Sequence, residues 1–126
     1  MPIKSTIDND KKLIRTNCTG LISMNDFYDY LDNFLSKNDL TGCNEIFDTT
    51  KADWSNISYM DLMEISKRSS EIETIDSSTK FAWVVGGPGI EKLTEFYQST
   101  KIFQESKSRV LRAFDDYEDA MNWLSH

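Results

Sequence analysis

Ile3, Ser5 and Ile7 alternate with polar neighbours, which is the pattern of a short strand at the edge of a sheet. A second strand is expected at about residues 13–19, before Gly20 interrupts it. Between the two, the sequence Asp-Asn-Asp at residues 8–10 is typical of a turn, because Asn and Asp tolerate positive φ angles. The pattern predicts a hairpin of two strands at the beginning of the chain.

The spacing of apolar residues changes after Gly20 to that of a helix. Ser23 and Asp26 have the three-residue separation of a capping box, so we expect the helix to begin here. The apolar positions that follow define one buried face of this helix. They are Met24, Phe27, Tyr28, Leu31, Phe34 and Leu35.

Strand and helix patterns then alternate. Residues 43–47 predict a third strand that ends at Asp48, and a polar loop leads from it to a second helix. Ser58 and Asp61 repeat the start signal of the first helix. The second helix is predicted to begin there and to extend to residue 75. Residues 81–85 form an uninterrupted apolar run, which is typical of a central strand buried on both faces.

The last part of the chain predicts a third helix, a fifth strand at residues 109–114 and a closing helix. Strands that alternate with helices pair in parallel through right-handed crossovers. We therefore predict an α/β fold, with one domain over residues 1–126 and a mixed five-stranded sheet in the order β-β-α-β-α-β-α-β-α, antiparallel at its N-terminal edge strand. The apolar positions of the last two helices are Ile90, Leu93, Phe96, Tyr97, Phe103, Tyr117, Ala120, Met121 and Leu124.

Composition and charge exclude several classes of function. The 126 residues suit one hydrophobic core, and the net charge is −7 at pH 7. Binding to nucleic acid or to an anionic membrane surface needs clustered Lys and Arg, and the sequence contains no basic stripe. It also shows no signal peptide and no apolar run long enough for a transmembrane segment, so we expect a soluble, cytoplasmic protein.

The sequence lacks the patterns of common catalytic and metal sites. Cys18 and Cys43 do not form a CxxC pair, which argues against a zinc site and against a disulfide framework. The only histidine is the terminal His126, so a Ser-His or Cys-His pair would depend on a frayed end. The GxSxG pattern of serine hydrolases is absent. We expect no metal site, no cofactor and no enzymatic activity.

The sequence Gly-Gly-Pro-Gly at residues 86–89 joins the central strand to the third helix, where nucleotide-binding folds often place a phosphate. It lacks the Lys-Ser/Thr of a P-loop and does not match GxGxxG. Pro88 also removes one backbone N–H from any anion-binding nest. We therefore favour a tight turn between strand and helix over a phosphate site.

The organisation of the chain resembles the STAS domain, and within it the SpoIIAA-like family. Three segments carry the resemblance: TGLISMNDFYDYL at residues 19–31, EIFDTT at residues 45–50 and RVLRAFDDYEDAMNWL at residues 109–124. They are similar to the family's strand-glycine-helix entry, its strand ending in Asp, and its closing strand and helix. The resemblance extends over nearly the whole chain and implies a binding or regulatory module without catalysis.

Anti-sigma factor antagonists of the STAS class carry a phosphorylatable Ser after an Asp near the start of the second helix. The corresponding stretch here is WSNISYMDL at residues 54–62, and Ser58 stands near that position. Asn56 and Ile57 replace the Asp-Ser of that motif, and no Gly follows. We interpret Ser58 as the N-cap of the helix rather than as a phosphoacceptor.

Two hypotheses describe the function. The first is a protein-interaction module that binds a protein partner or forms a homodimer, because Trp54 in an otherwise polar loop is typical of a contact surface; the alternative is that Trp54 packs over the sheet edge. The second is a binder or sensor of a small hydrophobic, lipid-like ligand, suggested by the fold similarity to Sec14 lipid-binding proteins. Phe81 and Trp83 would line its pocket or simply build the core. The candidate binding residues are Asp48, Thr49, Thr50, Trp54, Ser58, Gly86 and Gly87.

Overall fold

The computed structural model describes residues 2–72, 79–99 and 110–126. One sheet contains five strands in the order β1-β2-β3-β4-β5. β1 pairs with β2 antiparallel, and every other neighbouring pair is parallel. The predicted α/β fold with a mixed sheet is confirmed. The strands are β1 (Ile3–Asp8), β2 (Leu13–Leu21), β3 (Asn44–Asp53), β4 (Lys80–Val84) and β5 (Val110–Phe114).

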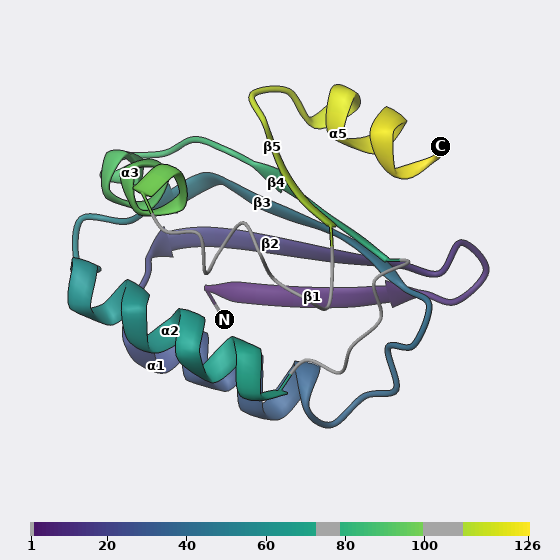
Figure 1. Cartoon of the computed structure of the whole chain (residues 1–126), viewed down its shortest axis with the longest axis horizontal. Coiled ribbons are helices and arrows are strands. Elements are labelled where there is room, and N and C mark those ends of the chain that lie inside the picture. The colour runs from purple at the N-terminus through teal and green to yellow at the C-terminus, as the bar shows by residue number, and fades with distance from the viewer. Residues whose placement is uncertain (1, 73–78, 100–109) are drawn as a thin grey trace.

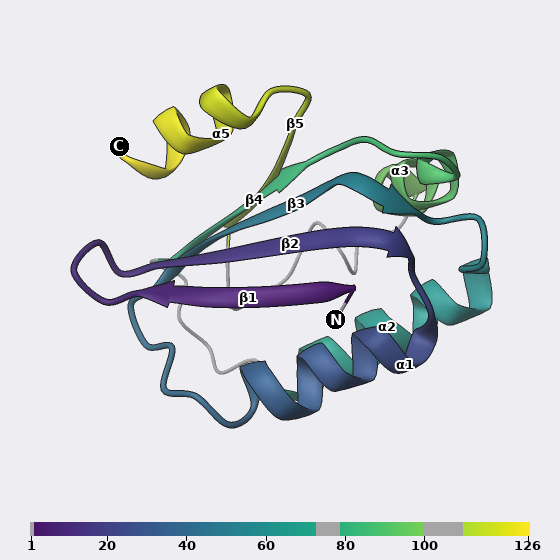
Figure 2. The same cartoon turned by 180° about the vertical axis from the view of Figure 1, so that it is seen from behind.

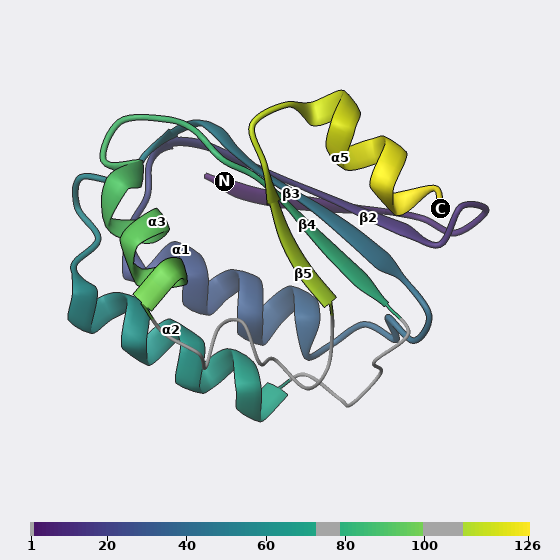
Figure 3. The same cartoon turned by 45° about the horizontal axis from the view of Figure 1, so that its top comes forward.

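The helices divide between the two faces of the sheet. Each crossover from β2 to β5 leads to the next strand in the same direction, so right-handed connections place α1, α2 and α3 on one face. Figures 1 and 2 show α1 and α2 side by side along this face, and Figure 3 shows α5 across the other. The helices are α1 (Met24–Asp29), its π-helical continuation η1 (Tyr30–Leu35), α2 (Tyr59–Ile72), α3 (Ile90–Ser99) and α5 (Tyr117–Leu124).

Each face of the sheet has its own hydrophobic core. The larger core lies beneath α1, α2 and α3 and includes the indole rings of Trp54 and Trp83. The smaller core lies between the sheet and α5 and includes Ala82 and Val84. β4 therefore contributes alternate side chains to both cores, which confirms the central strand that was expected from the apolar run.

Two strands are longer than the sequence indicated. β2 continues through Gly20, whose φ is 72°, and ends at Leu21. β3 continues past the predicted end at Asp48 and reaches Asp53. The two extensions pair with each other after a register shift, at which β3 contains one more residue than β2. Both predicted ends are wrong, because each strand is extended by hydrogen bonds to a partner strand that its own polar sequence does not reveal.

Other predicted boundaries fall partly outside the described residues. The second helix was predicted to residue 75, and the structure describes α2 as far as Ile72. Phe103, expected in the third helix, and Arg109, expected at the start of the fifth strand, lie outside the described residues. The helix-start prediction at Ser23 is confirmed, because its side chain and that of Asp26 form a reciprocal capping box.

A buried carboxylate links the sheet to the first helix. Glu45 in β3 is 0% exposed, and its Oε2 accepts hydrogen bonds from the hydroxyls of Thr16 and Tyr30, each at 2.6 Å. The Thr16 hydroxyl also bonds to that of Ser5 at 2.7 Å. Burial of a polar group without partners is costly, so these hydroxyls make the position tolerable and fix β1, β2, β3 and η1 relative to one another.

Candidate interaction surface

The candidate residues Thr49 and Trp54 lie inside the larger core. Both are 0% exposed. The Trp54 indole N–H donates to the Thr49 carbonyl oxygen at 3.2 Å, and the Trp83 indole N–H donates to the Thr49 hydroxyl at 3.1 Å. That hydroxyl donates in turn to the Val84 carbonyl oxygen at 2.7 Å. Of the two roles considered for Trp54, the structure shows packing, and neither residue is available to a partner.

The glycine-rich turn packs directly against the end of β3. A Cβ at Gly87, which has a φ of 94°, would lie 2.3 Å from the Ala52 carbonyl oxygen. A Cβ at Gly86 would lie 3.0 Å from Cγ2 of Thr50. The Pro88 carbonyl oxygen accepts from the Trp54 backbone N–H at 2.7 Å. The close approach of two backbones explains the glycines here, as expected for a tight turn.

The remaining candidate residues satisfy backbone groups. The Asp48 carboxylate accepts from the Thr50 backbone N–H at 2.9 Å and from its hydroxyl at 2.6 Å. Ser58 accepts from the Asp61 backbone N–H at 3.1 Å, and the Asp61 carboxylate accepts from the Ser58 backbone N–H at 2.9 Å. Ser58 is thus a helix cap. Because carboxylates of the chain itself occupy the starts of α1 and α2, these helix ends do not favour an anionic ligand.

The aromatic residues suggested for a ligand pocket pack against the protein's own side chains. Trp83 contacts Tyr97 edge-to-face with ring centroids 5.7 Å apart. Phe81 stacks on Phe47 with centroids 5.6 Å apart. Trp83 belongs to the larger core, and Phe81 is partly buried against it. Core packing, the alternative stated for these aromatics, accounts for both.

The described ranges contain neither a metal-ligating cluster nor a membrane-spanning helix. Within residues 2–72, 79–99 and 110–126, no group of three or more His, Cys, Asp and Glu side chains is arranged to hold a metal ion. Among the same residues, no helix has the length and apolar character to cross a bilayer. Both cysteines are buried and unpaired, and burial raises the pKa of the Cys18 thiol, with the charges of Asp48 and Glu45 acting in the same direction.

Exposed apolar side chains instead gather at the beginning of α2. Met60 is 80% exposed, Met63 62% and Tyr59 46%. These three residues, called the methionine patch below, lie within the first two turns of the helix, while Leu62 and Ile65 turn into the core. Large apolar side chains at this degree of exposure, three on neighbouring positions of one helix, are the pattern of a contact surface.

Carboxylates flank the methionine patch on both sides. Glu64 in α2 accepts a hydrogen bond from the Tyr28 hydroxyl of α1 at 3.1 Å, and Glu95 in α3 accepts one from the Tyr59 hydroxyl. The bond to Glu95 raises the pKa of the Tyr59 phenol. The helices α1, η1, α2 and α3 together carry eight acidic residues and three basic ones. These helices therefore carry an excess of five acidic residues.

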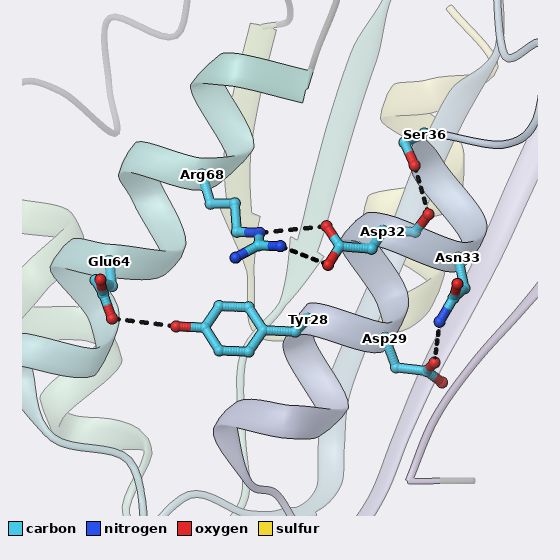
Figure 4. A network of polar contacts seen from close by, with 7 residues as sticks. All are labelled: Tyr28, Asp29, Asp32, Asn33, Ser36, Glu64 and Arg68. Atoms are coloured by element: carbon cyan, nitrogen blue, oxygen red, sulfur yellow. Dashed lines mark hydrogen bonds and ion pairs between the residues drawn. The ribbon is translucent and has the colours of Figure 1, made fainter.

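A polar network joins α1 and η1 to α2 (Figure 4). Arg68 forms a two-point ion pair with the Asp32 carboxylate, with its Nη2 2.6 Å from Oδ2 and its Nε 3.2 Å from Oδ1. The guanidinium also lies over the Tyr28 ring, 4.6 Å from its centroid. Desolvation raises the pKa of Tyr28, and its bond to Glu64 raises it further. The network is exposed, so we assign it to helix alignment with a modest energy.

The methionine patch was not among the sites expected from the sequence. The start signal at Ser58 placed the helix correctly, and the signal that would have found the patch was present in the helical spacing. Met60 and Met63 are three positions apart and off the stripe formed by Leu62 and Ile65. A helix that places two methionines outside its apolar stripe exposes them.

The comparisons with known proteins bear on the fold. No protein-family model matches the chain, and no curated protein matches it. A solved structure does match: an uncharacterized protein of the DUF3478 family with a SpoIIAA-like fold from Shewanella loihica PV-4, at a TM-score of 0.53 and 18% sequence identity over 97% of this chain and 91% of that one. The chain has a SpoIIAA-like fold.

The SpoIIAA-like fold agrees with the resemblance seen in the sequence. The two chains align over nearly their whole lengths. At this level of identity the likeness concerns the fold alone. Residues that carry a function must be argued from this chain's own surface.

Proposed function

We propose that this protein is a non-catalytic regulatory module that acts through protein–protein interaction, with the methionine patch as its contact surface. The exposure of Met60 and Met63 on an ordered helix carries the proposal. Methionine is flexible and polarizable, so exposed methionines adapt readily to the surface of a partner. The surface lies directly after Ser58, next to the loop named in the sequence hypothesis, but on the helix instead of in that loop.

The packing of the rest of this region supports the same proposal. Thr49, Trp54 and the glycine turn form a rigid base under the start of α2 because each is held by buried hydrogen bonds or close backbone contacts. The backbone of a contact surface on such a base loses little conformational entropy on binding. The alternative of a small hydrophobic ligand receives no comparable support, because Phe81 and Trp83 are engaged with the core.

Photo-crosslinking in the native host tests the proposal. A benzoylphenylalanine placed at Met60 should form a covalent adduct with another polypeptide, whereas the same residue placed at Leu21 should not. Leu21 is a matched control because it is also apolar and 56% exposed, but it ends β2 and does not belong to α2. Met63→Glu should suppress the adduct at position 60, because a charge at the centre of an apolar contact is costly.

Two results would count against the proposed function. The first is the absence of any polypeptide adduct at position 60 under conditions in which the variant is folded and expressed. The second is an equal yield of adducts at positions 60 and 21, which reports random encounters instead of a contact surface. Thermal unfolding of each variant, compared with the unmodified protein, verifies that the fold is retained.

A further inference from the structure

The charge around the methionine patch restricts the kind of partner it can accept. The helices of this face carry eight acidic and three basic residues, and one of the basic ones, Arg68, is paired with Asp32. Glu64 and Glu95 lie beside the patch and are held by tyrosine hydroxyls. An apolar centre with an acidic border is complementary to an apolar stripe with a basic border.

A second copy of this chain does not have the required charge. An isologous dimer through the patch would place each acidic face opposite an identical acidic face. Like charges brought together in this way oppose association. The same repulsion applies to anionic lipid surfaces and to nucleic acid.

We infer that the methionine patch docks a basic amphipathic helix of another protein. Its apolar side would lie on Met60 and Met63, and its Lys and Arg side chains would face Glu64 and Glu95. Recognition of an amphipathic helix by apolar anchors with flanking charges is an established mode of peptide binding, and long basic side chains reach from an apolar contact to carboxylates beside it. The inference rests on the proposed function, which it makes specific by naming the chemistry of the partner.

Model peptides provide a direct test with the full chain. The first is a helix of about 18 residues built from Leu and Lys with its Leu residues on one face. The second has the same composition in an order that mixes the two residue types around the helix, and the third replaces every Lys by Glu. Fluorescence anisotropy of the labelled peptides should show binding of the first, at least about tenfold weaker binding of the second and none of the third.

Two double variants separate the apolar contribution from the charged one. Met60→Gln with Met63→Gln should weaken binding of the Leu/Lys peptide by more than about tenfold. Glu64→Gln with Glu95→Gln removes two charges while leaving amide oxygens that still accept from the tyrosine hydroxyls. This variant should weaken binding by about tenfold at low salt, and the difference should shrink as ionic strength rises from about 0.05 M to about 0.5 M.

A matched control changes the same net charge elsewhere. Glu118→Gln with Asp119→Asn removes two exposed carboxylates from α5, on the opposite face of the sheet. Binding of the Leu/Lys peptide should be unchanged in this variant apart from a small general effect of net charge. Equal losses in the two charge variants, or equal binding of the ordered and mixed peptides, would overturn the inference, because both results indicate attraction to net charge alone.

The remaining outcomes distinguish this inference from the proposed function. An adduct at position 60 in the host, together with no binding of the Leu/Lys peptide, would reject the partner class and leave the interaction surface standing. Absence of both would reject the two proposals together. Sedimentation equilibrium should show a monomer. A dimer that dissociates when Met60 and Met63 are both replaced by Gln would identify a second copy of the chain, and not a basic helix, as the partner of the methionine patch.

Discussion

Trp54 and the methionine patch are close in sequence and opposite in exposure. Trp54 follows a polar stretch and is 0% exposed, whereas Met60 lies near the start of an amphipathic helix and is 80% exposed. The polarity of the neighbouring residues would have predicted an exposed Trp54 and a buried Met60. The exposure of a large side chain therefore depends on which part of the fold lies opposite it.

The physical cause of the difference is the path of the backbone. The extension of β3 to Asp53 brings Trp54 over the larger core, where Pro88 and Thr49 accept its backbone and indole N–H groups. In α2 the inward positions are taken by Leu62 and Ile65. Met60 and Met63 are consequently directed to the outside of the helix.

Among the variants that test this difference, truncation of Trp54 should cause the largest loss of stability. Trp54→Ala removes a fully buried indole that contacts Phe27, with ring centroids 5.8 Å apart, and it also removes the hydrogen bond to Thr49. We expect the free energy of unfolding to fall by about 3–5 kcal/mol, measured by urea denaturation. The free energy of unfolding of Trp54→Phe should lie between those of Trp54→Ala and the wild type. A loss below about 1 kcal/mol for Trp54→Ala would contradict the packing role.

The glycine turn that covers Trp54 should give the next largest effect. Gly87→Ala introduces a methyl group 2.3 Å from the Ala52 carbonyl oxygen at a φ of 94°, so we expect a loss of about 2–4 kcal/mol in the same assay. Gly20→Ala is the matched control, because its φ of 72° is similarly left-handed and no atom outside its neighbours lies within 4 Å. The control should cost only about 1 kcal/mol. Equal losses of stability in the two variants would mean that backbone strain at positive φ, and not the close contact with β3, is the reason for glycine at position 87.

Thiol chemistry can compare the two regions directly. Cys18 and Cys43 are buried, and burial raises the pKa of Cys18, so its reactive thiolate is depleted at neutral pH. A thiol reagent such as DTNB should therefore modify the folded protein slowly, at a rate that follows unfolding. In Met60→Cys, one additional thiol should react at the rate of an exposed cysteine. Rapid modification of the wild type at neutral pH would show that the interior opens more readily than the structure indicates.

Polar substitution of the patch should have the smallest effect on stability. Met60→Gln with Met63→Gln should change the free energy of unfolding by no more than about 0.5 kcal/mol, because both side chains are largely in water already. The same variant should lose the peptide binding described above. A large destabilisation would indicate that the methionines support the fold, and it would weaken the case for a contact surface.

Patterns confined to one element were sufficient for much of the fold. The alternation in residues 3–7, the apolar run at residues 81–85 and the start signals at Ser23 and Ser58 depend on neighbours a few positions away in the chain. Right-handed crossovers then follow from the order of strands and helices. The SpoIIAA-like arrangement of one mixed sheet was predictable for this reason.

Features that need two distant segments were decided only by the tertiary structure. The extension of β3 depends on pairing with β2, the burial of Glu45 on hydroxyls from Thr16 and Tyr30, and the burial of Trp54 on the turn that contains Pro88. The acidic border of the methionine patch likewise comes from two helices, because Glu64 lies in α2 and Glu95 lies in α3. A linear pattern records the side chains of each segment, whereas burial and charge at a surface depend on which segments the fold places against one another.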